Sequence, residues 1–444
     1  MAGEWQVSTL ENAPLEIIDG DRGTNYPNQA EFSATGYCLF LNAGNVTTNG
    51  FRFSDCVFIT AGKDASLRKG KLNRKDVILT TRGTVGNTAF FDGSVPFDHI
   101  RINSGMVILR AQTPALEPLY LYLFVRSALF HAQVSALRTG SAQPQLPIRD
   151  INRIEIPLPP PEEQRAIANI LGTLDDKIEL NRRMNETLEA MARALFKSWF
   201  VDFDPVRAKA EGRDPGLPKP VADLFPARLI ASELGDIPEG WKFQSFASTV
   251  EIISGGTPKT SVPAYWDGDI PWFSIVDAPT GTDVWVVDTE KKITQAGVEN
   301  SSTRILPVGT TIISARGTIG RVALVGVPMA MNQSCYGIKG KVGAHGLFTY
   351  FSMQELVADL QQYAHGSVFD TITRDTLAGI SVVVPPKTVV ETFEKIASPI
   401  LERVRQTILN TRIIATIRNA LLPKLISGEL RIGGTGDVVN GETG

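Results

Sequence analysis

The six residues Thr81-Arg82-Gly83-Thr84-Val85-Gly86 return further along the chain as Ala315-Arg316-Gly317-Thr318-Ile319-Gly320, shifted by 234 positions. The apolar residues that precede the two blocks also match, as Val77-Ile78-Leu79 and Thr311-Ile312-Ile313. A match of this kind at a long fixed distance is typical of an internal repeat, which is best sought before any other feature. The sequence therefore predicts two diverged copies of one structural unit.

Further pairs of short strings support the repeat, because they occur in the same order in both copies. The distance between partners falls from 236 to about 226 residues along the chain, as deletions within loops would produce. The pairs are Gly3-Glu4-Trp5 with Glu239-Gly240-Trp241, Glu16-Ile17-Ile18 with Glu251-Ile252-Ile253, Gly140-Ser141 with Gly366-Ser367, Arg149-Asp150 with Arg374-Asp375, and Pro159-Pro160 with Pro385-Pro386.

Each copy changes character at its Pro-Pro pair. Before that pair, short β-branched and aromatic runs alternate with Gly, Asn, Asp and Pro, which predicts a mostly β domain. Residues 119–137 and 347–363 have helical spacing within these domains. After the Pro-Pro pair the pattern becomes helical, so the expected class is α+β. The expected domains are 1–158 and 238–385 for the two mostly β domains, 159–200 and 386–430 for long helices, 201–237 for a Pro/Gly-rich connector, and 431–444 for a disordered tail.

Each long helix carries a heptad stripe that is apolar at both ends and polar in the middle. In antiparallel pairing the two polar layers would meet, so the sequence predicts an antiparallel coiled coil. The alternative is that each helix packs only on its own domain, and Pro399 favours this slightly because it must start or kink its helix. Arg418 is the exception in the second stripe. The predicted seam consists of Leu171, Leu174, Ile178, Asn181, Asn185, Leu188, Ile400, Val404, Thr407, Thr411, Ile414 and Leu421.

Composition narrows the class of protein. A net charge of −3 over 444 residues counts against a simple nucleic-acid binder, so any DNA-binding face must be local. The basic run Lys63 to Lys75 is one candidate, with a solvated loop as the alternative. No apolar run approaches the length of a membrane helix and the start lacks a signal-peptide pattern, so we expect a cytoplasmic protein. Three cysteines and four histidines form no metal-binding pattern, and no metal is expected.

The motifs of DNA-modifying and nucleotide-hydrolysing enzymes do not occur. The sequence has no Asn/Asp-Pro-Pro-Tyr/Phe loop, no GxxxxGK[ST] phosphate loop, no HExxH and no GxSxG. We therefore expect no catalytic residues in this chain, although carboxylates that are distant in sequence could still meet in the fold.

Several strings resemble specificity subunits of type I restriction-modification systems across nearly the whole chain. They are EIIDGDRGTNYP, LNAGNV and ILTTRGTVGN in the first copy, GDIPEGW, ISGGTP, YWDGDIPW and ISARGTIG in the second, and LPPPEEQRAIANIL and SWFVDFDPVRAKAEGRDPGLP between. The resemblance implies two domains that each read half of a bipartite double-stranded DNA site. It also implies that two methyltransferase subunits dock on the helices, that motor-nuclease subunits complete the enzyme, and that S-adenosylmethionine, ATP and magnesium bind those partners.

Candidate DNA contacts fall into two groups. Arg82, Thr84, Arg316 and Thr318 recur in both copies, so we expect them to hold phosphates, with a purely structural turn as the alternative. Bases should be read where the copies differ, at Arg22, Asn25 and Tyr26 and at Lys259, Tyr265 and Trp266, with an aromatic core as the alternative for the last two. Asn332-Gln333-Ser334 follows the family pattern whereas Asn103-Ser104-Gly105 departs from it, so the first copy is expected to position its contacts differently.

The long helices also carry apolar residues off the seam, which fit either methyltransferase docking or cover by the chain's own domains. They are Ile170, Met184, Met191, Phe196, Ile396, Ile408 and Ile417. Three rival functions remain open. They are a protein-binding scaffold, a DNA-reading subunit of a methylation-only or other defence complex, and a self-sufficient DNA enzyme.

Overall fold

The computed structural model describes residues 5–139, 144–233, 235–279, 283–341, 346–363 and 371–432. The chain divides into unit 1, Met1–Ile178 with Ile413–Gly444, and unit 2, Glu179–Arg412, so each unit contains part of both long helices. The repeated strings Gly140-Ser141 and Gly366-Ser367, and the expected tail from residue 433 on, lie outside the described residues.

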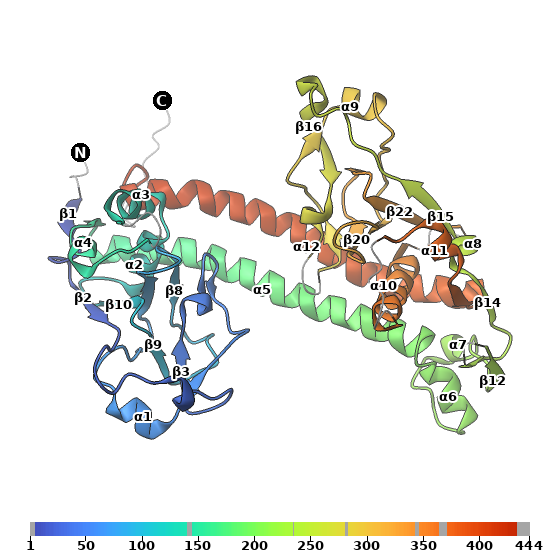
Figure 1. Cartoon of the computed structure of the whole chain (residues 1–444), viewed down its shortest axis with the longest axis horizontal. Coiled ribbons are helices and arrows are strands. Elements are labelled where there is room, and N and C mark those ends of the chain that lie inside the picture. The colour runs from blue at the N-terminus through green and yellow to red at the C-terminus, as the bar shows by residue number, and fades with distance from the viewer. Residues whose placement is uncertain are drawn as a thin grey trace, which may run out of the picture. The chain divides into compact units, whose positions relative to one another are not determined.

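Unit 1 builds its target domain from short strands and helices (Figure 1). The strands are β1 (Gln6–Thr9), β2 (Leu15–Asp19), β3 (Cys38–Leu41), β4 (Val46–Thr47), β5 (Gly50–Phe51), β6 (Phe58–Ile59), β7 (Val77–Thr80), β8 (Thr88–Phe90), β9 (Ile100–Ile102), β10 (Met106–Ala111) and β11 (Glu155–Leu158). The helices are α1 (Ala61–Ser66), α2 (Pro118–Val125), α3 (Ala128–Leu137) and α4 (Ile148–Ile151).

The central sheet of unit 1 has the strand order β2-β10-β7-β8. All its pairs are antiparallel, and Ile108 of β10 lies opposite both Ile18 and Ile78. Both faces are covered: Val77 packs toward α2 and the long helices, while Ile78 packs toward the second sheet, β6-β3-β9. Burial on both faces explains why β7 is apolar at consecutive positions rather than alternating.

Unit 2 repeats this architecture with further elements. Its strands are β12 (Leu229–Ser232), β13 (Gly235–Pro238), β14 (Lys242–Ser245), β15 (Val250–Ser254), β16 (Trp266–Phe273), β17 (Trp285–Val286), β18 (Lys292–Ile293), β19 (Thr311–Ser314), β20 (Val322–Val325), β21 (Ala330–Met331), β22 (Cys335–Gly340) and β23 (Ser381–Val384). Its helices are α6 (Asp204–Ala210), α7 (Lys219–Ala222), α8 (Phe246–Thr249), α9 (Gln295–Glu299), α10 (Gly346–Tyr363) and α11 (Arg374–Ala378).

The strand order confirms the internal repeat. The sheet of unit 2 runs β15-β22-β19-β20, as β2-β10-β7-β8 does in unit 1, and adds β17 parallel to β20 at its edge. The smaller sheets also correspond, because β3 pairs in parallel with β9 as β16 does with β21. The α+β class and the two mostly β domains are therefore as expected.

Both predicted internal helices are present, but they differ in continuity. In unit 1 the segment divides into α2 and α3 at Arg126, and the Ser127 hydroxyl accepts a hydrogen bond from the Phe130 N–H at 3.3 Å to start α3. In unit 2 the corresponding helix, α10, continues without a break.

The two long helices are α5 (Pro161–Phe200) and α12 (Lys387–Ser427). Pro399 lies inside α12 and does not start it, so the suggestion that this proline begins the helix is wrong. In unit 2 Asn181 donates from Nδ2 to Oγ1 of Thr411 at 2.9 Å, while Ala192 shares a cluster with Leu401. Residue numbers therefore rise along one helix as they fall along the other within this unit. Whether the helices supercoil around each other stays a prediction.

Every residue of the predicted seam is buried or half-buried. The helices also pack on the domain of their own unit, since Ile167 and Leu171 of α5 share a cluster with Tyr120 of α2. Pairing and domain packing therefore occur together rather than as alternatives. The polar layer is only partly satisfied, because Oδ1 of Asn185 is buried and finds no hydrogen-bond partner in the part of the chain that the structure describes.

The connector has its own secondary structure. It contains α6, α7 and the hairpin of β12 and β13. Phe203, Val206 and Phe225 pack with Trp199 and Trp241 in the core of unit 2. The connector is therefore part of that core rather than a flexible spacer.

Candidate nucleic-acid interface

The Arg-Gly-Thr blocks form the same turn in both units. In unit 1 the Thr80 hydroxyl donates to the carbonyl oxygen of Thr84, and the Gly86 N–H donates to the Thr80 carbonyl at 3.0 Å. Unit 2 repeats both bonds, from the Ser314 hydroxyl to the Thr318 carbonyl at 2.6 Å and from the Gly320 N–H to the Ser314 carbonyl at 3.0 Å. The turn is a structural feature of the repeat.

Arg82 and Arg316 occupy the exposed part of this turn. Each precedes a glycine in the left-handed region, with φ of 73° at Gly83 and 76° at Gly317, a conformation that favours glycine. Both arginines are exposed, and within the described residues neither guanidinium has a hydrogen bond or an ion pair. The fold therefore presents one uncommitted guanidinium at the same position of each domain.

A second turn packs beside the first. In unit 1 Oδ1 of Asn103 accepts from the N–H of Gly105 at 2.8 Å, and the Gly105 carbonyl accepts from the N–H groups of Thr81 and Arg82. In unit 2 the corresponding bonds join Asn332 to Ser334 at 3.0 Å and Ser334 to Ala315 at 2.8 Å. The departure of the first copy from the family string thus leaves this backbone turn unchanged. The difference lies in the side chains, Ser104 against Gln333.

The loop after the first sheet strand reaches the same place in each unit. A Cβ on Gly20 would lie 2.2 Å from the carbonyl oxygen of Asn103, and one on Gly255 would lie 1.9 Å from that of Asn332. Only glycine permits this approach. In unit 1 it brings Arg22 to the turn, where Nη2 donates to the Ser104 carbonyl at 3.3 Å and to Asp19 at 3.2 Å.

The other two unit 1 candidates are less available. Asn25 is exposed, but its Nδ2 donates to the Ser66 carbonyl at 3.1 Å. Tyr26 is half-buried and packs edge-on against Phe40 with ring centroids 5.6 Å apart, so it serves the core.

The basic run Lys63 to Lys75 supplies two residues that the sequence alone did not single out. Arg68 and Lys69 donate their backbone N–H groups to Oδ2 of Asp21, beside Arg22. Burial raises the pKa of Asp21, but these N–H groups and that of Gly23 outweigh the effect and lower it, so this carboxylate stays ionised. The side chains of Arg68 and Lys69 are exposed and unpaired within the described chain.

The rest of that run is largely neutralised. Lys63 pairs with Glu31 at 2.9 Å, Lys71 with Asp64 at 2.6 Å, and Arg74 with Asp98 at 3.1 Å. The run therefore stays a candidate for a local DNA-binding face, with a solvated loop as the alternative, although three of its six cations have an acidic partner. These ion pairs could not be predicted from the run itself, because the acidic partners come from other parts of the sequence or depend on the fold.

In unit 2 the aromatic candidates serve mainly as core. Trp266 is half-buried, lies edge-on to Trp272 with centroids 5.2 Å apart, and donates from Nε1 to the carbonyl of Lys259 at 3.2 Å. Tyr265 is also half-buried. Lys259 is exposed. Thr257, on the same loop as Lys259, donates a hydrogen bond from its hydroxyl to Oε1 of Gln333. Of the predicted contacts of unit 2, Lys259 and Arg316 therefore have exposed side chains, and Gln333 lies in the turn beside Arg316.

The exposed cations and amide groups of this arrangement suit contact with DNA. Guanidinium and ammonium groups bind phosphates, and arginine and glutamine also recognise purine edges. Over the described residues no cluster of histidine, cysteine and acidic groups could hold a metal ion. In the same part of the chain, no helix has the length and apolar character needed to cross a bilayer.

Two carboxylates attach the target domain of unit 2 to its helices. Glu189 of α5 is buried, and its Oε1 accepts from the Val284 N–H at 3.2 Å, while Oε2 has no hydrogen-bond partner among the described residues. Burial raises its pKa to about 8. Glu394 of α12 accepts from the Phe348 N–H at 2.8 Å at the start of α10, and burial raises its pKa to about 7. In unit 1 the neutral amide of Gln164 accepts from Glu117 at 2.9 Å instead.

Comparison with known proteins agrees with this architecture. The family model described as "Type I restriction modification DNA specificity domain" matches residues 3–190 and 238–419, one match per copy. The HindI specificity subunit of Haemophilus influenzae is 26% identical over 456 residues, which cover 93% of this chain and 98% of the relative. The MjaIX specificity subunit of Methanocaldococcus jannaschii is 23% identical, with 84% and 81% covered.

Among solved structures, an S subunit of a type I restriction-modification system from M. genitalium shares the fold. It superposes with a TM-score of 0.61 at 14% identity and covers 96% of this chain and 97% of its own. Because the family model spans both copies of the repeat, the chain belongs to the type I restriction-modification DNA specificity family and is a DNA-recognition subunit.

Proposed function

We propose that each target domain reads one half of a bipartite site in double-stranded DNA and that this chain contributes no catalytic group. The observation that carries the proposal is the repeated turn, which presents Arg82 and Arg316 identically on one backbone scaffold. Different side chains surround the two arginines. A constant cation beside variable polar groups is the arrangement expected when phosphates position the protein and base edges specify the sequence.

The surrounding groups suggest how the two halves differ. In unit 1 Arg22 bonds to the neighbouring turn, and Arg68 and Lys69 bond through their backbone to Asp21, next to Arg22. In unit 2 Gln333 bonds to Thr257, two residues before Lys259. Both units therefore offer cations, which favour guanine or phosphate, and unit 2 adds the amide of Gln333, which favours adenine. If both domains approach one face of the duplex, the half-sites should lie about one helical turn apart, roughly 34 Å.

We further propose that the long helices dock two methyltransferase subunits and, through them, motor-nuclease subunits. Ile170, Met191, Ile396 and Ile417 remain exposed, as an interface would require, whereas Phe196 is buried within unit 2 and Ile408 packs against its core. S-adenosylmethionine, ATP and magnesium would then bind the partners. The complex would act in the cytoplasm, where the genomic DNA is.

The proposal is tested by mapping methylated bases across the genome of a host that carries the chain with its cognate methyltransferase. The matched control is a strain that lacks only this chain. A bipartite motif should vanish with the deletion, and its halves should change separately when residues 1–150 or 236–380 are exchanged for those of a relative.

Other outcomes favour the rival functions. An unchanged methylome in a host with demonstrable methyltransferase expression would contradict DNA reading and favour a protein-binding scaffold. A motif that is methylated without any accompanying restriction would indicate a methylation-only complex. Base modification or DNA cleavage by the purified chain alone would contradict the non-catalytic assignment.

A further inference from the structure

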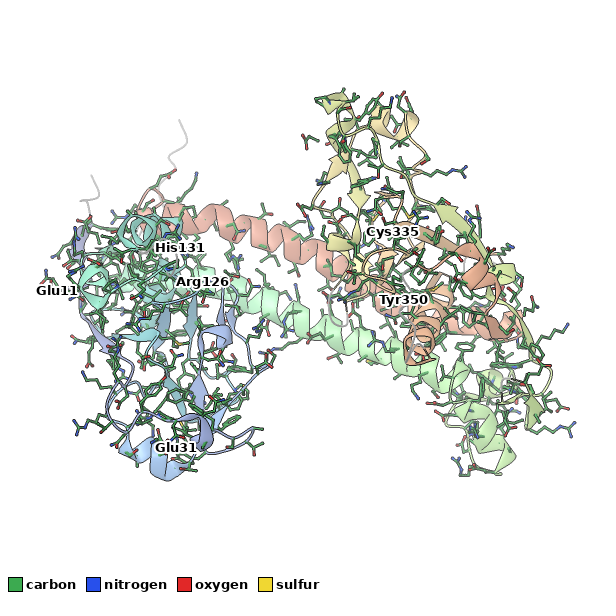
Figure 2. The ribbon with its side chains drawn as sticks, in the orientation of Figure 1. Glu11, Glu31, Arg126, His131, Cys335 and Tyr350 are labelled. Carbon is green, nitrogen blue, oxygen red and sulfur yellow. The ribbon has the colours of Figure 1, made fainter. Side chains whose placement is uncertain are left out.

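A polar cavity of about 230 Å³ lies in unit 1 beside the turn that joins β7 and β8. Its walls come from Gly86 and Asn87 at the base of the turn, from α2 and α3, and from the parts of α5 and α12 that belong to unit 1. Arg126 and His131, which line it, lie close together on the helical side of the target domain (Figure 2).

Two guanidinium groups share one carboxylate at this cavity. Nη1 of Arg126 donates to one oxygen of Asp175 at 2.7 Å, and Nη1 of Arg418 donates to the other at 2.6 Å. All three side chains are only about one quarter exposed. Because the lining contains no second acidic residue, the cluster retains an excess positive charge in a partly desolvated place, where electrostatic attraction is stronger than in water.

Donors remain after these bonds are made. Nε and Nη2 of Arg418 both donate to Oδ1 of Asn419, and Arg126 lies over the Tyr122 ring at 5.1 Å, so both guanidinium planes are fixed. Nε and Nη2 of Arg126 have no partner among the described residues. A fixed, partly satisfied guanidinium is well suited to bind an oxyanion.

Unit 2 shows that the helix pair does not need these charges. A shift of 226 residues places Leu401 at the position of Asp175 and Ala192 at the position of Arg418. Leu401 and Ala192 are fully buried together in an apolar cluster. Apolar residues can therefore pack at the same position, and buried ion pairs add little net stability. Stability alone does not explain why unit 1 has charged residues there. They also account for Arg418 as the exception in the heptad stripe.

We propose that this cavity is a binding site for a phosphate group. The excess positive charge, the fixed guanidinium donors and the neighbouring Asn87 and His131 match the charge and hydrogen-bonding needs of a phosphate oxyanion. Burial lowers the pKa of His131, so its imidazole is neutral at neutral pH and can donate from one nitrogen. The site is distinct from the exposed Arg82 turn and does not depend on the proposed DNA reading.

The test is calorimetric titration of the full-length chain with inorganic phosphate. We expect one saturable site per chain. Arg418→Gln should weaken binding about tenfold or more, because it removes a charged donor. Asp175→Asn should tighten binding, because it removes the competing anion while keeping the side-chain shape. A purely structural salt bridge predicts no such gain.

Arg182→Gln is the matched control, since it removes a positive charge from an exposed ion pair of α5, and Arg182 does not line the cavity. It should leave the isotherm unchanged. If Arg418→Gln loses helical circular dichroism, Arg126→Gln replaces it, because Arg126 lies on the target domain rather than on the helix pair. Absence of saturable phosphate binding, or binding that neither Arg418→Gln nor Asp175→Asn alters, would overturn the proposal.

The same variants distinguish two sources of the phosphate group. If the site receives a backbone phosphate of DNA, inorganic phosphate should compete with a short duplex and Arg418→Gln should weaken duplex binding by the assembled complex. If it receives a free phosphate or a phosphorylated metabolite, duplex binding should be unchanged while phosphate still binds. Both results support the site and assign its ligand.

Discussion

The two target domains share a backbone plan but attach to their helices in different ways. Strand order, the Arg-Gly-Thr turn and the Asn turn beside it are the same in both. In unit 1 the attachment uses the neutral Gln164 and the Asp175 cluster, whereas unit 2 uses the buried carboxylates of Glu189 and Glu394 with an aromatic core. The comparison indicates that a common function constrains the turns, whereas the contacts between each target domain and its long helices are free to vary.

The largest effects should follow from breaking the shared turns. Gly255→Ala places a Cβ against the backbone of Asn332, and Gly20→Ala does the same at Asn103, so each should cost about 3 kcal/mol or more in its own unit. Hydrogen exchange of the sheet peptides should show unfolding confined to that unit. Gly62→Ala, where no atom lies within 4 Å, is the control and should have little effect. Equally faster hydrogen exchange in both units after either substitution would contradict the expectation that the damage stays within one unit.

The buried carboxylate of unit 2 should make that unit sensitive to pH. The folded pKa of Glu189 is about 8, above its ordinary value of 4.5, because burial disfavours the charge and Asp283 and Glu186 add repulsion that Arg193 only partly offsets. Its contribution to stability is therefore complete below pH 4.5 and is lost as pH rises through 8.

The unfolding temperature of unit 2 should accordingly decrease as the pH is raised from 5 to 8.5. Glu189→Gln keeps the bond to the Val284 N–H without the charge, so it should remove most of this slope and stabilise unit 2 at pH 8.5 by about 2 kcal/mol. Unit 1, with its neutral Gln164, provides the internal control. A slope that persists in the variant would assign the effect to Glu394 or Asp283, whose pKa values are also raised, and would contradict a role for Glu189.

The repeated arginines test whether the shared turn has a shared task. Arg82→Ala and Arg316→Ala should each weaken duplex binding by the assembled complex by about 1–2 kcal/mol and lower the salt dependence by about one unit, without altering the preferred sequence. Arg22→Ala should instead relax the preference in one half-site. A change of sequence preference in either turn variant would show that the turn reads bases rather than phosphates.

The repeat was predictable because its strings are contiguous in sequence, and the strands fall where those strings lie. Other features depend on residues that are distant along the chain. Arg418 interrupts the heptad stripe in the sequence. In the structure it binds Asp175 of α5, which also binds Arg126 of the target domain. Arg68 and Lys69 reach the candidate interface only because Asp21 binds their backbone. Spacing alone could not assign Tyr26 and Trp266 to the core, because amphipathic aromatic residues occur in both environments.

The smallest expected effect concerns the repeated tryptophans. Trp5 donates from Nε1 to Oε2 of Glu163 at 3.1 Å and lies against the Arg431 guanidinium at 4.8 Å. Trp241 is buried in unit 2, and within the described residues its Nε1 has no hydrogen-bond partner. Trp5→Phe breaks a bond to a charged group and should cost about 1–2 kcal/mol in unit 1.

Trp241→Phe loses ring volume but also removes an unsatisfied buried donor, so these effects oppose each other and the net cost should be about 1 kcal/mol smaller than at Trp5. Chemical denaturation of each variant, followed by hydrogen exchange in each unit, would measure the difference. Equal costs would mean that the Nε1 bond in unit 1 adds nothing and that both tryptophans act only by volume. A larger cost at Trp5 would show that repetition of a residue in the sequence preserves its place in the fold but not the interaction that it makes there.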